Sequence, residues 1–152
     1  MDHELIRYRK VPKRWKYQLT DSHVHRLHFS LDEAFSDLVT PFGERSAREP
    51  GKVYLVASVP GQLDLYSDGR LVIANGYAWD GPSGPTINSE SSMRGSLVHD
   101  ALYQLIREGL LPASLKPTCD WELAEICIED GMWRWRARLW AWMLVQFGWT
   151  AL

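Results

Sequence analysis

The 152-residue sequence has few cysteines and no long apolar run. Its two cysteines, Cys119 and Cys127, lie in one predicted helix, where the helix rise separates them by about 12 Å. That separation is beyond the reach of a disulfide, so we expect free thiols in a reducing compartment. The longest nearly apolar run, residues 139–145, is far shorter than the roughly 20 residues of a membrane-spanning helix. The sequence therefore predicts no membrane span.

An excess of either charge is also missing, because 17 basic and 19 acidic residues give a formal net charge of -2. Such a chain has no bulk field to hold a polyanion, and we find no strong signal for nucleic-acid binding. The first residues mix acids and bases without an apolar stretch, which argues against a secretory signal peptide. The length and the 45% hydrophobic content predict one globular domain, residues 1–152.

The order of the patterns predicts an α+β fold, with strands in the first half and helices in the second. The β-rich part, residues 13–75, has alternating segments at 13–19 and 23–29 that we expect to form a hairpin, and further strands at 52–59, 62–67 and 70–75. Asp68-Gly69 is predicted to be a two-residue turn in which both residues need positive φ. A motif loop, 76–92, leads to a helical part, 93–148, with helices at about 93–109, 115–129 and 133–147. A small antiparallel sheet should pack one face against about three helices.

Three motifs follow one another between the last strand and the second helix. Residues 79–85 read Trp-Asp-Gly-Pro-Ser-Gly-Pro, a turn that its prolines stiffen. Next comes a helix with His99-Asp100-Ala-Leu-Tyr103, and then Asp120 near the start of another helix. Asp80 either bonds its own turn or has a catalytic or ligand role. His99 and Asp100 point about 100° apart, so they either converge on one ion or His99 holds the turn by bonding Asp80.

These motifs, in this order, resemble a family of unknown function that is common in tailed phages, prophages and their bacterial hosts. In that family, strands lead into a W/T-D-x-A/P-S turn, followed by H-D-x-L-Y and an Asp near the start of the next helix. The resemblance covers about residues 50–148 and implies the fold and a phage context, in the host cytoplasm or the virion. It implies no reaction. Cys119 departs from the family pattern, because many relatives carry a small residue before the Asp.

The candidate catalytic residues are Asp80, His99, Asp100 and Asp120. They would gather one divalent metal ion or hold a water, with one carboxylate as general base. The supporting residues are Trp79, Ser83 and Tyr103. The scissile bond, a phosphoester or an amide, stays open.

The upstream histidines give a second candidate metal site. His-Asp metal phosphohydrolases also have a His, then His-Asp, then Asp, and here His23, His25 or His28 would be the first. That superfamily is wholly helical, so the likeness is at most a convergence of chemistry. His23 and His25 on one strand would share a face at chelating distance, with His28 facing the other way. An exposed polar strand face is the alternative.

Two nucleophile candidates have weaker support. Ser83 does not fit a nucleophile elbow, because Pro85 stands where the motif needs glycine. Cys119 and His99 would form a thiol–imidazole pair only if the cysteine were reactive, and a cysteine at a helix start is usually packed or merely exposed.

The last helix is rich in tryptophan and arginine. The spacing of five of its residues predicts a core stripe: Trp133, Ala137, Trp140, Leu144 and Phe147. Trp135 and Trp142 lie on another face, where they would contact a second copy or a phage or host protein.

Two functions therefore stay open. The first is a small metal-assisted hydrolase with a His/Asp site. The second is a noncatalytic phage structural or host-interaction protein in which the same residues lock the loop to the helices.

Overall fold

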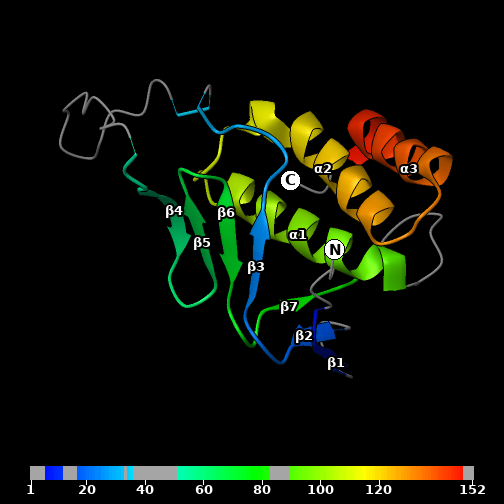
Figure 1. The fold of residues 1–152 in the computed structure, drawn as a ribbon, viewed down its shortest axis with the longest axis horizontal. Helices are drawn as coiled ribbons and strands as arrows, with labels where there is room; N and C mark the ends of the chain where they lie inside the picture. The colour runs from blue at the N-terminus through cyan, green and yellow to red at the C-terminus, as the bar shows by residue number, and fades with distance from the viewer. Residues whose placement is uncertain (1–5, 12–16, 33, 36–50, 83–89, 149–152) are drawn as a thin grey trace.

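A computed structural model describes residues 6–11, 17–32, 34–35, 51–82 and 90–148. In these residues, seven short strands form two antiparallel sheets and precede three α-helices (Figure 1). The strands are β1 (Tyr8–Lys10), β2 (Tyr17–Leu19), β3 (His23–Arg26), β4 (Leu55–Val59), β5 (Leu63–Tyr66), β6 (Arg70–Ile73) and β7 (Ala78–Trp79). The helices are α1 (Glu90–Arg107), α2 (Lys116–Glu129) and α3 (Arg134–Phe147), with a 3-10 turn, η1 (Ala113–Leu115), before α2. This confirms the predicted α+β fold.

The predicted hairpin between the segments 13–19 and 23–29 is wrong, because β2 and β3 belong to different sheets. β2 pairs with β1 and β7, whereas β3 pairs with β6 at the edge of the sheet β3-β6-β5-β4. Alternation identifies a strand but does not choose its partner. β7, one partner of β2, and β6, the partner of β3, lie between 44 and 62 residues away along the chain, where no local turn signal can reveal them.

The hairpin of β5 and β6 is confirmed, but its turn differs from the predicted one. The amide of Gly69 donates to the carbonyl of Tyr66 at 2.9 Å, so three residues form the loop. Among the described residues only glycines have positive φ, and Gly69 has φ 85°. Asp68 instead accepts a hydrogen bond from the Arg70 amide at 3.1 Å. A type I turn closed by a left-handed glycine places the strain on one residue instead of two.

The larger sheet and α1 share the main core. The inward side chains of β5 and β6 are completely buried or nearly so, and they pack with apolar residues of α1: Leu63, Leu65, Leu71 and Ile73 with Leu97, Val98, Ala101 and Leu102. α2 lies between α1 and α3 (Figure 1). At the α1–α2 crossing a Cβ on Gly95 would lie 2.7 Å from the Cys127 sulfur, so glycine permits the close approach.

The helix ends follow the sequence signals closely, with two corrections. α1 already begins at Glu90, three residues before the predicted start at 93. On α3, Ala137 and Trp140 are buried as predicted, but Trp133 is 72% and Phe147 70% exposed. The buried residues of α3 are confined to its middle, where the helix packs on α2, so the predicted core stripe is too long at both ends. None of the described helices is both long and apolar enough to cross a membrane.

Candidate functional site

The Trp79-Asp80-Gly81 turn is fixed against α1 by its tryptophan. Trp79 is 1% exposed, and its indole Nε1 donates to Ser96 Oγ at 3.1 Å. A Cβ on Gly81 would lie 2.5 Å from the Tyr17 ring, so only glycine permits this path. With Trp79 turned inward at the end of β7, the next side chain, Asp80, is exposed. The turn therefore presents a carboxylate beside the helix that carries His99.

A buried polar network joins the histidine of α1 to the aspartate of α2. Asp120 is 0% exposed, and its Oδ1 lies 2.8 Å from His99 Nε2. The same oxygen accepts a hydrogen bond from the hydroxyl of Tyr103. Its Oδ2 accepts from Lys116 Nζ at 2.7 Å, and this ammonium also donates to the Leu144 carbonyl of α3 at 2.8 Å. Asp120 thus connects all three helices.

The network perturbs the acid–base behaviour of its members. Burial alone would raise the pKa of Asp120, but the hydrogen bonds from His99, Lys116 and Tyr103 hold that pKa below its usual value. Burial alone would lower the pKa of His99, but the carboxylates of Asp100 and Asp120 outweigh it and raise that pKa. The His99 ring therefore keeps its second proton to a higher pH than an ordinary histidine.

One edge of the network opens into a cleft of about 850 Å³ between the turn and α1. The second ring nitrogen of His99, Nδ1, lies 3.8 Å from Asp100 Oδ1, and the Asp100 side chain is 37% exposed. Asp80, His99 and Asp100 all line this cleft, together with Tyr103 and Gln104. Three of the four predicted catalytic side chains therefore share one polar cavity, with Asp120 behind them.

Among the described residues, no three of the four predicted side chains bring ligand atoms within 4.8 Å of one another. Within the described part of the chain, no hydrogen bond or ion pair joins Asp80 to His99, whose partner is Asp120 instead. The metal ion that was predicted for Asp80, His99, Asp100 and Asp120 stays a prediction. Ser83 lies outside the described residues.

Cys119 lacks the properties of a nucleophile. It is 0% exposed, and burial raises the pKa of its thiol to about 12, so it stays a thiol at neutral pH. Cys127 is buried as well, and both cysteines are free, as predicted. A thiol–imidazole pair with His99 is therefore not supported.

The sequence prediction missed Lys116, although a signal for it exists. Lys116 and Asp120 are spaced i, i+4, and side chains at that spacing on a helix meet. The lysine is 0% exposed, which is rare for an ammonium unless a carboxylate faces it. It was missed because a lysine at a helix start usually lies in solvent.

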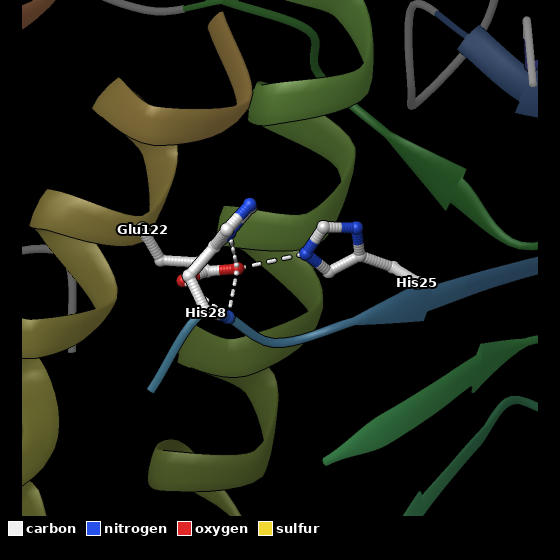
Figure 2. Close-up of side chains that lie close together, drawn as sticks. All are labelled: His25, His28 and Glu122. Carbon is white, nitrogen blue, oxygen red and sulfur yellow. Dashed lines mark hydrogen bonds and ion pairs between the residues drawn. The ribbon is translucent and has the colours of Figure 1, made fainter. Parts of the chain in front are cut away.

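A second histidine–carboxylate cluster lies at the end of β3, away from the cleft. Figure 2 shows His25, His28 and Glu122 pointing toward one another, with the carboxylate between the two rings. Glu122 Oε1 lies 2.7 Å from His25 Nε2 and 2.9 Å from His28 Nδ1. The prediction that His28 faces away is wrong, because β3 ends at Arg26 and the strand alternation ends with it. His23, predicted to pair with His25, has a buried Nε2 without a hydrogen-bond partner among the described residues.

Comparisons with known proteins do not assign this chain to a family. No protein-family model, curated protein or solved structure matches it. The resemblance of about residues 50–148 to a phage family therefore stays a prediction. A function has to be argued from the cleft and its side chains.

Proposed function

We propose that the cleft between the Trp79-Asp80-Gly81 turn and α1 is the active site of a small hydrolase. The observation that carries the proposal is the orientation of His99. Its Nε2 is held by Asp120 at 2.8 Å, while Nδ1 lies 3.8 Å from the half-exposed Asp100 at the cleft. A buried carboxylate that orients an imidazole whose other nitrogen faces a second carboxylate is an arrangement suited to proton transfer.

The raised pKa of His99 assigns it the role of the acid. Because its pKa is raised, the ring can carry a second proton and donate it from Nδ1 to a leaving group, while the Asp100 carboxylate takes a proton from the attacking water. The water oxygen bonds to the substrate, the scissile bond breaks, and the leaving group takes the proton of His99. The proton on Asp100 then returns to His99 Nδ1 through a bridging water, because the 3.8 Å between the two atoms exceeds hydrogen-bond distance. Asp120 positions the ring and does not touch the substrate.

The charges of the cleft favour a neutral polar substrate. Its lining residues include three carboxylates, from Asp80, Asp100 and Glu108, against the guanidinium of Arg107 and the protonated ring of His99. A site with more acidic than basic groups repels phosphate esters. We therefore propose an ester or amide bond in a polar molecule, in place of a phosphoester.

This acid–base hydrolase differs from the metal-assisted one that the sequence suggested. Both oxygens of Asp120 already accept hydrogen bonds, from Tyr103 on one side and Lys116 on the other. Asp120 would have to give up these donors before it could bind an ion. Metal assistance is therefore an outcome for the experiment to detect, through loss of turnover on chelation.

The experiment measures hydrolysis of four bond classes by the full chain: nitrophenyl esters, anilides, phosphomonoesters and phosphodiesters. We expect turnover of the ester or anilide, with a loss of about 100-fold or more in both His99→Gln and Asp100→Asn. Glu125→Gln is the matched control, because Glu125 is exposed on α2 and does not line the cleft. Turnover should also survive a chelator. A wild type that hydrolyses none of the four classes, or equal rates in both cleft variants and the control, contradicts the proposal.

The noncatalytic alternative is favoured by the satisfied state of Asp120. Its three donors brace α1, α2 and α3, which is what a purely structural network would do. The predicted lock between loop and helix takes a different form, since it is Trp79 that bonds Ser96. In this alternative the protein acts as a phage structural or host-interaction protein. His99→Gln would then lower the melting temperature, and no member of the substrate panel would be turned over.

A further inference from the structure

The cluster at the end of β3 has the donor atoms of a transition-metal site. His25 Nε2, His28 Nδ1 and a carboxylate oxygen of Glu122 all lie within 4.8 Å of one another. Two imidazole nitrogens and one carboxylate oxygen are a common zinc ligand set, whereas Ca²⁺ and Mg²⁺ prefer oxygen ligands alone. Among the described residues, no other three histidine, cysteine or carboxylate side chains bring their ligand atoms this close together.

Two of the three distances between the ligand atoms are close to those of a metal-bound arrangement, and the third, between the two imidazole nitrogens, is within 4.8 Å. Glu122 Oε1 is now hydrogen-bonded to both histidines, at 2.7 Å from His25 Nε2 and 2.9 Å from His28 Nδ1. Ligand atoms around a tetrahedral Zn²⁺ lie about 3.3 Å apart, so the carboxylate has to withdraw by about half an ångström. An ion would replace the protons of these hydrogen bonds, and its binding would release them to solvent.

The three side chains are fixed by hydrogen bonds and burial of the kind that support metal ligands in proteins. Nε2 of His28 contacts Glu129 Oε1, and Glu129 Oε2 accepts a hydrogen bond from Arg94 Nη2 at 2.7 Å. A metal-binding histidine typically donates its other N–H to such a carboxylate, which fixes the tautomer and the ring. Both oxygens of Glu122 also lie 3.2 Å from the amide nitrogen of His28. The Glu122 side chain is 2% exposed and that of His25 is 4% exposed, so both are held in place.

We propose that His25, His28 and Glu122 bind one divalent transition-metal ion of the Zn²⁺ type. His28 is 35% exposed, so the ion enters from its side and keeps a water there as fourth ligand. The ion would tie the end of β3 to α2 (Figure 2), and through Glu129 and Arg94 to α1. This site is separate from the cleft, and the hydrolase proposal does not depend on it.

The experiment is a Zn²⁺ titration of the full chain against a chromophoric chelator, with Co²⁺ absorption as a direct report of the ligands. We expect one ion per chain and a visible Co²⁺ band. His28→Gln and Glu122→Gln should weaken Zn²⁺ binding by about 100-fold or more, since each removes a ligand. Glu129→Gln should weaken it about 10- to 100-fold, because it removes only the support of His28. Mg²⁺ should not compete.

Two control variants test whether the ion binds at this cluster and whether a loss of binding is specific to its ligands. Glu125→Gln lies three residues from Glu122 on an exposed part of α2 and should bind Zn²⁺ like the wild type. His99→Gln should also bind normally, and a loss in this variant would place the ion in the cleft and overturn the proposal. His28→Gln is the main variant, because the side chain is 35% exposed and its replacement leaves no cavity in the core. Circular dichroism verifies the fold. A wild type without stoichiometric Zn²⁺ would make the cluster a hydrogen-bonded triad only.

Discussion

Asp120 and Glu122 lie two residues apart on α2, and both bury a carboxylate against histidine, yet their partners differ. Side chains at that spacing point about 200° apart, so one helix serves two clusters on opposite sides. Asp120 faces a lysine, a tyrosine and one histidine. Among the described residues, the side chains that bond Glu122 are those of His25 and His28.

The difference lies in the cation that compensates each carboxylate. A lysine carries its charge throughout the physiological range, whereas histidine gains or loses its charge within it. The negative charge of Asp120 therefore faces an ammonium as well as the imidazole, which leaves His99 available for proton transfer at the cleft. The side chains that bond Glu122 among the described residues are imidazoles, and a metal ion can replace the protons that it shares with them. Asp120 thus belongs to a network whose cation is an ammonium, and Glu122 to one made of imidazoles, which can also bind a metal ion.

The largest expected effect separates the two carboxylates by stability. Asp120→Asn should lower the free energy of unfolding by about 3–5 kcal/mol, because the buried ammonium of Lys116 loses the carboxylate that faces it. Glu122→Gln should cost about 1–2 kcal/mol, since the amide oxygen still accepts a hydrogen bond and the histidines can become neutral. Urea denaturation measures both, beside Glu125→Gln, which should lie within about 0.5 kcal/mol of the wild type. Equal losses in the two buried variants would remove the distinction between the clusters.

A smaller effect should appear in the pH dependence of the first cluster. The raised pKa of His99 in the folded state makes its stabilisation complete below the unfolded value of about 6.5, and this stabilisation is lost as pH rises through the folded pKa. The lowered pKa of Asp120 acts in the opposite direction, so its contribution is lost only below about pH 4. The difference in unfolding free energy between the wild type and His99→Gln, about 1–3 kcal/mol near pH 6, should therefore shrink toward pH 9. A difference that stays constant from pH 5.5 to 9 would mean that folding does not shift the pKa of His99, and one that grows over this range would mean that folding lowers it.

The sequence predicted the features whose signal lies within a few neighbouring residues, and it missed contacts between residues far apart in the chain. α1 and α3 end close to their predicted ends at 109 and 147, just before Gly109 and Gly148, because a glycine ends a helix through its local conformation. The choice of strand partners depends on residues far apart, and so does the contact of His28 with Glu122, 94 positions away. His99 and Asp120 were chosen together from motifs, and the structure joins them at 2.8 Å.

Other parts of the site required the three-dimensional structure. Asp80 was expected to meet His99, but no local pattern shows that Trp79 takes the inward position and turns Asp80 to the surface. Glu122 carries no motif at all, since a glutamate on a helix is usually solvated. Its burial follows from the direction of the chain after β3, which strand alternation cannot predict.

The smallest effect on stability concerns a region outside both clusters, the exposed aromatic side of α3. Trp135 is 63% and Trp142 49% exposed, so the double variant Trp135→Ser, Trp142→Ser should keep the unfolding free energy within about 0.5 kcal/mol of the wild type. If this side contacts a second copy, as predicted, the wild type sediments as an oligomer and the double variant as a monomer. Trp121→Ser, which removes a 42% exposed tryptophan from α2, is the control and should leave the oligomer intact. A wild type that is monomeric at high concentration would exclude self-association and leave a phage or host protein as the predicted partner. A large loss of stability in the double variant would instead show that α3 contributes to the fold through this side as well as through its buried contacts on α2.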